Sequence, residues 1–177
     1  YYLYSHGLGA WMVFLSTGLS LVALITGRNT FENNYRNFAI AIFALMGAMN
    51  GTFLAADAVL FFFFFEAMVF PAAVLIAGFG GADRKKAAMT FAIYTLVGSA
   101  PMMVALWYLL TVADNSLVLS LAVAIQNLEP SMQVTLLVCF LLAFLVKTPL
   151  FPFHGWQAIT YAEAPAPLSA ILTGAMS

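Results

Sequence analysis

Long apolar segments separated by short polar loops constrain the fold of this chain more than any other feature. A membrane-spanning helix needs about 20 mostly apolar residues to cross about 30 Å of hydrocarbon. Hydrophobic residues make up 64% of the chain and charged residues 7%, whereas soluble domains have roughly 45–50% and about 25%. No soluble core can bury so much apolar surface. We therefore expect an integral membrane protein that has the lipid bilayer as a direct partner.

The apolar segments predict an all-α fold, a polytopic bundle of transmembrane helices with one helix broken by proline. The expected helices are residues 8–26, 37–56, 58–79, 87–112 and 131–149, followed by an incomplete helix at 165–177. The last part would be too long for a single crossing, but it is interrupted by Pro149, Pro152, Gly155, Pro165 and Pro167. Residues 114–130 are too short to cross and mix apolar with polar side chains, so we expect a loop or helix along the membrane interface.

We treat residues 1–177 as a single transmembrane domain and as a fragment of a longer chain. The sequence does not begin with Met, and the apolar pattern at 170–177 predicts a helix still in progress. No basic stretch precedes the first apolar segment, so no cleavable signal peptide is predicted.

Basic residues are confined to alternate loops. The loops after the first and third expected spans carry Arg28, Arg36, Arg84, Lys85 and Lys86. The opposite loops carry only acidic charges, namely Asp57, Asp114 and Glu129. The positive-inside rule then predicts that the basic loops face the cytoplasm or the equivalent matrix side.

Several classes of function are excluded by what the sequence lacks. A net charge of −1 argues against a nucleic-acid partner. Cys139 is the only cysteine, so no disulfide can form within the chain and no cysteine-rich metal site is predicted. We also find no hydrolase triad, phosphate-binding loop or dinucleotide fingerprint. The remaining polar inventory is suited to handling protons or ions.

Two charged residues, Glu66 and Lys147, fall well inside apolar helices. Each costs at least about 2.5–3.5 kcal/mol at a helix centre, so each needs a partner, a water-filled cavity or a neutral form. Pro71 lies five residues after Glu66 and leaves a backbone carbonyl free beside it. A structural role remains open for both residues: Glu66 could bond a neighbouring helix, and Lys147 could extend to the interface near a helix end.

His154 follows Lys147 in the proline-interrupted stretch. Because the imidazole titrates near neutral pH, His154 is a candidate proton relay. A role as a helix cap or interface residue is equally open. Glu66 and Lys147 are therefore the main candidates for proton transfer, and we expect them to face one interior polar path.

Two blocks of sequence resemble the antiporter-like subunits of respiratory complex I, most closely the chain 4 or subunit M type. The first block comprises Phe64-Phe65-Glu66-Ala67-Met68, Pro71, Gly80-Gly81, Arg84 and Tyr94-Thr95-Leu96-Val97-Gly98-Ser99. The second comprises Leu142 to His154, Trp156 and Glu163-Ala164-Pro165. The resemblance runs from about Gly7 to the end of the chain.

The resemblance implies an inverted-repeat antiporter-like fold, of which this chain covers most of the first repeat. It implies that Glu66 and Lys147 are the proton-channel pair of a proton-translocating subunit of NADH:quinone oxidoreductase. Such a subunit would carry no cofactor, so NADH, FMN, Fe-S centres and quinone would be bound by partner subunits. The expected location is the bacterial plasma membrane or an equivalent energy-conserving membrane.

One segment departs from the family pattern. The family usually has Trp-Leu-Pro-Asp-Ala-His where this chain has Trp156-Gln157-Ala158-Ile159-Thr160-Tyr161. The segment Pro165 to Ala170 is also similar to subunits of Mrp-type Na⁺/H⁺ antiporters and membrane-bound hydrogenases. These complexes are therefore alternative parents, with Na⁺ as an alternative to H⁺. A purely structural membrane subunit without a proton path is a third interpretation.

Overall fold

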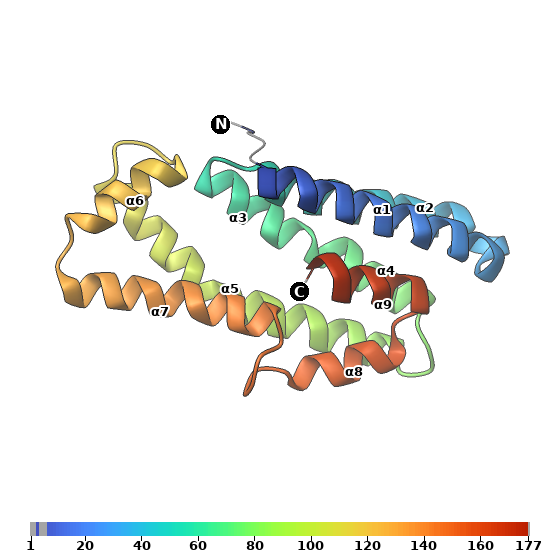
Figure 1. Ribbon diagram of the computed structural model, residues 1–177. Helices are drawn as coiled ribbons and strands as arrows, with labels where there is room; N and C mark the ends of the chain where they lie inside the picture. Colours follow the sequence, from blue (N-terminus) through green and yellow to red (C-terminus); the bar gives the residue numbers. More distant parts are fainter. Residues whose placement is uncertain (1–2, 4–6, 177) are drawn as a thin grey trace.

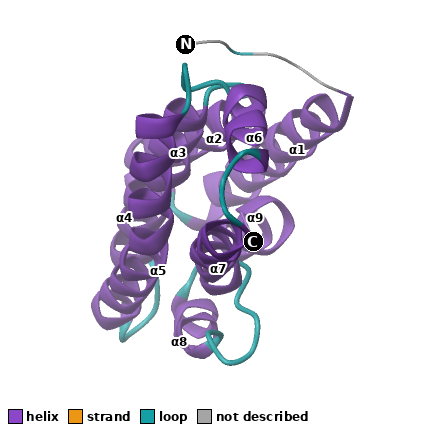
Figure 2. Ribbon diagram, turned by 90° about the vertical axis from the view of Figure 1, so that its left-hand side faces the viewer, coloured by secondary structure: helices purple, strands orange, loops and turns teal. Residues whose placement is uncertain are grey.

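The computed structural model describes residue 3 and residues 7–176, and within them the chain is built from helices (Figures 1 and 2). The elements are α1 (Gly7–Thr30), a 3₁₀ turn η1 (Glu32–Asn34), α2 (Tyr35–Leu54), α3 (Ala58–Ala67), α4 (Val69–Phe79), α5 (Arg84–Val112), α6 (Val118–Gln126), α7 (Pro130–Lys147), α8 (Gly155–Glu163), α9 (Ala166–Ile171) and a π-helical turn η2 (Leu172–Met176). Among the described residues, five segments are long and apolar enough to cross a membrane, and α3 and α4 together form one of them. The predicted all-α class is confirmed.

The helix boundaries differ from the expected ones where proline acts. The segment 58–79 is divided into two helices at Met68, a turn residue with helical backbone angles (φ −68°, ψ −21°) that lies three residues before Pro71. Helix α7 ends at Lys147, since the residue before a proline disfavours helical geometry and Pro149 follows closely. By contrast, α5 continues through Pro101. Part of the stretch expected to be irregular forms α8.

The centre of the bundle is formed mainly by α2 and α4. On α2, fully buried side chains recur at helical spacing: Phe38, Ile42, Leu45 and Met49. They meet Leu75 and Ile76 of α4 in one buried cluster. Helix α5 packs along both α4 and α7, and α9 packs against α1. The outward faces are also apolar, with Trp11, Phe14, Phe70 and Trp107 largely exposed. Such a surface is suited to lipid or further membrane helices.

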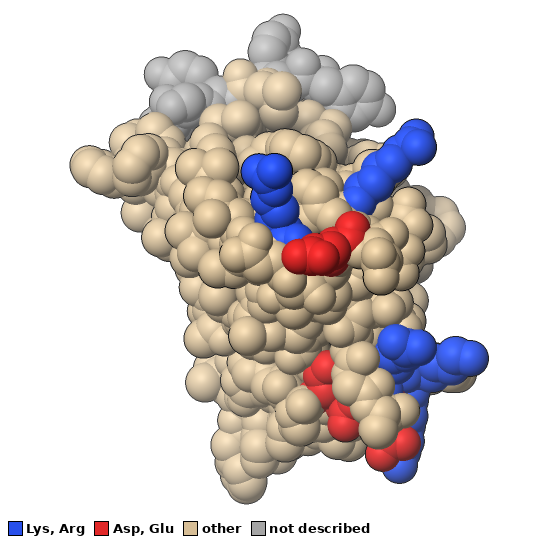
Figure 3. Space-filling view, turned by 90° about the vertical axis from the view of Figure 1, so that its right-hand side faces the viewer, with Lys and Arg blue, Asp and Glu red and all other residues tan. Residues whose placement is uncertain are grey.

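The charged loops lie at the ends of the bundle. The α1–α2 and α4–α5 connections share one end, and the α2–α3 and α5–α6 connections lie at the other (Figure 1). Figure 3 faces the first end, where Lys and Arg side chains gather with several carboxylates. The two basic loops are therefore on the same side of the bundle. Which side of the membrane they face remains a prediction.

Asp57 joins the two loops at the opposite end. Its carboxylate caps α3 by accepting hydrogen bonds from the amides of Val59 and Leu60, both at 3.0 Å, and it also accepts one from the Ser116 hydroxyl. Burial alone would raise the pKa of this carboxyl. The hydrogen bonds outweigh burial, so the pKa lies below its ordinary value. Asp57 is thus a structural connection that loop charge alone did not indicate.

Replacing Asp57 by Ala is expected to lower the free energy of unfolding by about 1–2 kcal/mol, because a helix cap and a buried hydrogen bond are lost together. Thermal unfolding of the full-length protein in detergent measures this. Since the folded pKa of Asp57 is depressed, its contribution is present above the ordinary aspartate pKa and is lost as pH falls through the depressed value. Exposed Asp114→Ala is the matched control, and an equal effect of the two substitutions would contradict the capping role.

Candidate functional site

The site is formed where two interrupted helices meet. Lys147 is the last residue of α7 and is only 5% exposed. Its ammonium donates a hydrogen bond to the backbone carbonyl of Phe65, 82 residues earlier, at 2.5 Å. The same nitrogen lies 3.6 Å from the centroid of the Phe65 ring. The lysine therefore points into the bundle, and a role in reaching the interface does not fit this geometry.

Glu66 follows Phe65 at the end of α3, two residues before the break at Met68. Glu66 is the ninth residue of α3, which places it about 13 Å along the helix from Asp57 and near mid-depth of a bilayer about 30 Å thick. Its Oε1 is buried and has no hydrogen-bond partner among the residues that the structure describes. Glu66 interacts electrostatically with Lys147. The structure thus brings the two intramembrane charges into one region, with the lysine hydrogen-bonded to the carbonyl beside the acid.

The end of α7 is fixed by an indole group. The Trp156 N–H donates to the Val146 carbonyl at 2.8 Å, while the Leu150 amide bonds the carbonyl of Leu145 instead. This leaves the Val146 carbonyl available, as expected near a helix terminus. Trp156 is buried, and its ring packs on Phe91 of α5 with centroids 5.4 Å apart. Helix α8 is thereby attached directly beside Lys147.

His154 lies at the start of α8 and is exposed. Its ring is 5.9 Å from that of Phe151 in the preceding loop. The structure places it in the connection that follows Lys147, outside the buried contacts of the lysine. A relay role for His154 remains a prediction.

Helix α8 carries two buried hydroxyls in the segment that departs from the family pattern. Thr160 Oγ1 and Tyr161 Oη are buried and, like Glu66 Oε1, have no hydrogen-bond partner in residues 3 and 7–176. Thr160 lies one turn after Trp156 on the same face of the helix. Sequence reasoning did not select either hydroxyl. The four-residue spacing between Trp156 and Thr160 could have indicated that both lie on one buried helix face.

Glu163 attaches the end of α8 to the basic end of the bundle. Its carboxylate accepts a hydrogen bond from the Asp83 amide at 2.9 Å, and its backbone carbonyl accepts one from Gly81 at 3.0 Å. A Cβ on Gly80 would lie 2.7 Å from that carbonyl oxygen and 2.5 Å from the Ile76 oxygen. The glycine pair therefore permits the close approach of α8 to the α4–α5 connection.

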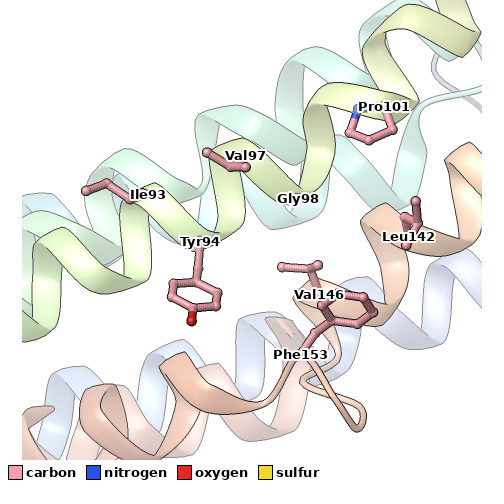
Figure 4. Close-up of a pocket in the computed structure, with 8 residues that line it drawn as sticks. All are labelled: Ile93, Tyr94, Val97, Gly98, Pro101, Leu142, Val146 and Phe153. Carbon is pink, nitrogen blue, oxygen red and sulfur yellow. The ribbon is translucent and has the colours of Figure 1, made fainter.

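An apolar groove of about 360 Å³ lies between α5 and α7 (Figure 4). Its lining comprises Ile93, Tyr94, Val97, Gly98, Pro101, Leu142, Val146 and Phe153. Tyr94 points from α5 towards α8, while Val146 projects from α7 near Phe153. The groove offers few polar groups and is unsuited to binding an ion. Within the described part of the chain, no three His, Cys, Asp or Glu side chains are grouped to hold a metal.

Comparison with known proteins identifies the family. The family model described as NADH:quinone oxidoreductase/Mrp antiporter, transmembrane, matches residues 55–177. This chain belongs to that family. NADH-quinone oxidoreductase subunit M of Rickettsia prowazekii is 29% identical over 168 residues, which cover 95% of this chain and 34% of that protein. NAD(P)H-quinone oxidoreductase chain 4 2 of Thermosynechococcus vestitus is 35% identical over 165 residues, which cover 93% of this chain and 31% of that protein.

A solved structure of this family shares the fold. A chain of respiratory complex I from Thermus thermophilus superposes with a TM-score of 0.81 at 33% identity, covering 96% of this chain and 35% of that one. The present chain thus spans about a third of the length of the relatives it matches. The resemblance to the subunit M or chain 4 type of antiporter-like membrane subunit is confirmed, as is the prediction of an integral membrane protein.

Proposed function

We propose that the parent protein is a proton-translocating subunit of NADH:quinone oxidoreductase and that Glu66 and Lys147 carry the proton. The observation that supports this most is a buried lysine that bonds the carbonyl of the residue before Glu66, whose Oε1 is buried and has no hydrogen-bond partner among the described residues. Charges at this depth are costly and are functional by default. The choice of NADH:quinone oxidoreductase as the parent complex rests on the similarity to the chain 4 and subunit M relatives.

The proposed step is a proton transfer between the two groups. One N–H bond of the Lys147 ammonium breaks, and its proton passes to the Glu66 carboxylate directly or through water. The products are a neutral amine and a carboxylic acid, so the region holds the same number of protons before and after. A change in nearby charge shifts the balance between these two states, because electrostatic interactions are strong where water is scarce. Loss of the proton from Glu66 to one side of the path and reprotonation of the Lys147 amine from the other side then reset the site.

The electron-transfer chemistry belongs to other subunits in this proposal. NADH, FMN, iron–sulfur centres and quinone bind to partners, while this chain contributes a proton path and contacts other membrane subunits. His154 is proposed as a relay between that path and its surroundings, since imidazole can accept and release protons near neutral pH. Protons are proposed as the transported ion because an acid and an amine, both able to exchange protons, lie in one region of the bundle.

A second candidate parent is an Mrp-type Na⁺/H⁺ antiporter, which the description of the matching family also includes. The two parents differ in their partners. We expect the full-length protein, purified with an affinity tag from its native membrane, to bring with it flavin- and iron–sulfur-containing subunits that oxidise NADH. Recovery of a complex without redox subunits that exchanges Na⁺ for H⁺ would instead establish the antiporter as the parent.

A further inference from the structure

Phe65 contacts the Lys147 ammonium through two chemically different groups. The backbone carbonyl accepts its hydrogen bond, and the face of the aromatic ring lies 3.6 Å from the nitrogen. Phe65 is only 6% exposed. Both contacts therefore act away from bulk water, where the attraction between a cation and an aromatic face is strongest.

The Phe65 ring is fixed by two aromatic neighbours. Phe61, one turn earlier on α3, stacks against it with centroids 5.6 Å apart and planes inclined by 23°. Phe144 of α7 approaches with its centroid at 6.0 Å and an interplanar angle of 79°. Phe144 also precedes Lys147 by about one helical turn, so α7 supplies both the cation and a ring that packs on its partner. This arrangement keeps the face of Phe65 directed at the ammonium.

The two acceptors stabilise the charged form of the lysine without using the carboxylate of Glu66. A carbonyl oxygen and the face of an aromatic ring are both electron-rich, but neither can accept a proton at physiological pH. Glu66 is the next residue on α3, and its buried Oε1 has no hydrogen-bond partner within the described part of the chain. The ammonium therefore lies in the same region of the bundle as the Glu66 carboxylate, while it is bound to groups that cannot take its proton.

We propose that Phe65 is a positioning residue for proton transfer, holding the Lys147 ammonium on its ring face and carbonyl between transfers so that the Glu66 carboxyl stays free to receive the proton. This inference rests on the proposed function of Glu66 and Lys147. It assigns to an apolar side chain a role that depends on electron density as well as on volume. A ring that merely filled space would act through its shape alone.

Stepwise fluorination of Phe65 separates electron density from shape, because each fluorine weakens the negative face of the ring with little change in size. The full-length subunit carrying mono-, di- or trifluorophenylalanine at position 65 is assembled in the complete complex and reconstituted in vesicles. We expect NADH-driven proton translocation to fall with each added fluorine, by on the order of tenfold at three fluorines. Phe65→Leu, which removes the ring, should be at least as impaired.

Phe38 provides the matched control. It is fully buried on α2, and its ring contacts are with Phe31 and Phe79. Graded loss at position 65 with no loss at position 38 supports the inference. Unchanged translocation with trifluorophenylalanine at 65, or equal loss at both positions, overturns it. Lys147→Ala is measured in parallel: normal pumping by that variant refutes the proposed function, whereas impaired pumping with an unaffected fluorine series refutes only the role of Phe65.

Discussion

Lys147→Ala in the full-length subunit is expected to abolish proton translocation through this subunit, while the protein still inserts and the complex assembles. Removing the amine deletes the group that gives up the proton, and positioned acid–base groups contribute roughly 10²–10⁴-fold to proton-transfer rates. Loss of the buried charge also removes a cost of insertion, so membrane integration should not suffer. NADH-driven acidification of vesicles, normalised to assembled complex, measures the effect.

Lys147→Arg distinguishes charge from proton exchange. Arg keeps a positive charge but does not release its proton at accessible pH, so the variant should also be severely impaired. Exposed Lys85→Ala at the start of α5 is the matched control and should pump normally. If Lys147→Arg pumped as well as the wild type, a fixed positive charge would suffice and the protonation step would be wrong.

Glu66→Gln has the second largest expected effect. Gln preserves the shape and polarity of the side chain but cannot take up a proton, so pumping should fall by roughly 10² or more. Glu66→Asp keeps the carboxyl at a shorter reach and should retain part of the activity. The measurement is again vesicle acidification by the assembled complex.

Exposed Glu129→Gln at the start of α7 is the control for loss of a carboxylate, and it is expected to have little effect. Full activity of Glu66→Gln would leave the carboxylate with a packing role and would favour the structural interpretation of this subunit. If both Glu66→Asp and Glu66→Gln prevented assembly of the complex, that result would also favour the structural interpretation.

The membrane-spanning helices could be predicted from sequence because apolar length is a local property. The interruption around Pro71 and the end of α7 before Pro149 likewise follow from the missing N–H and the steric demands of proline. Helix α8 was not predicted, because it has only nine residues and prolines lie on both sides of it. Its stability comes from tertiary contacts such as the Trp156 indole bond, which local pattern does not reveal.

The candidate site was only partly predictable. Energetic cost marked Glu66 and Lys147 as unusual, and resemblance to a family connected them. The hydrogen bond from Lys147 to the carbonyl of Phe65 could not be inferred, because any residue has a carbonyl and only the packing of α7 on α3 selects this one. Asp57 was read as a loop charge, whereas its contacts with Ser116 and the start of α3 depend on how two distant loops meet.

The central claim is that Glu66 and Lys147 act as one proton-transfer unit, and a double-mutant cycle on proton translocation tests it most directly. The assembled complex is compared as wild type, Glu66→Gln, Lys147→Ala and the double variant, each assayed by NADH-driven acidification in the same vesicles. Residues that act as a unit give strongly non-additive effects. The account predicts that the double variant pumps no worse than either single variant. Losses that multiply in the double variant would show two independent roles and would contradict it.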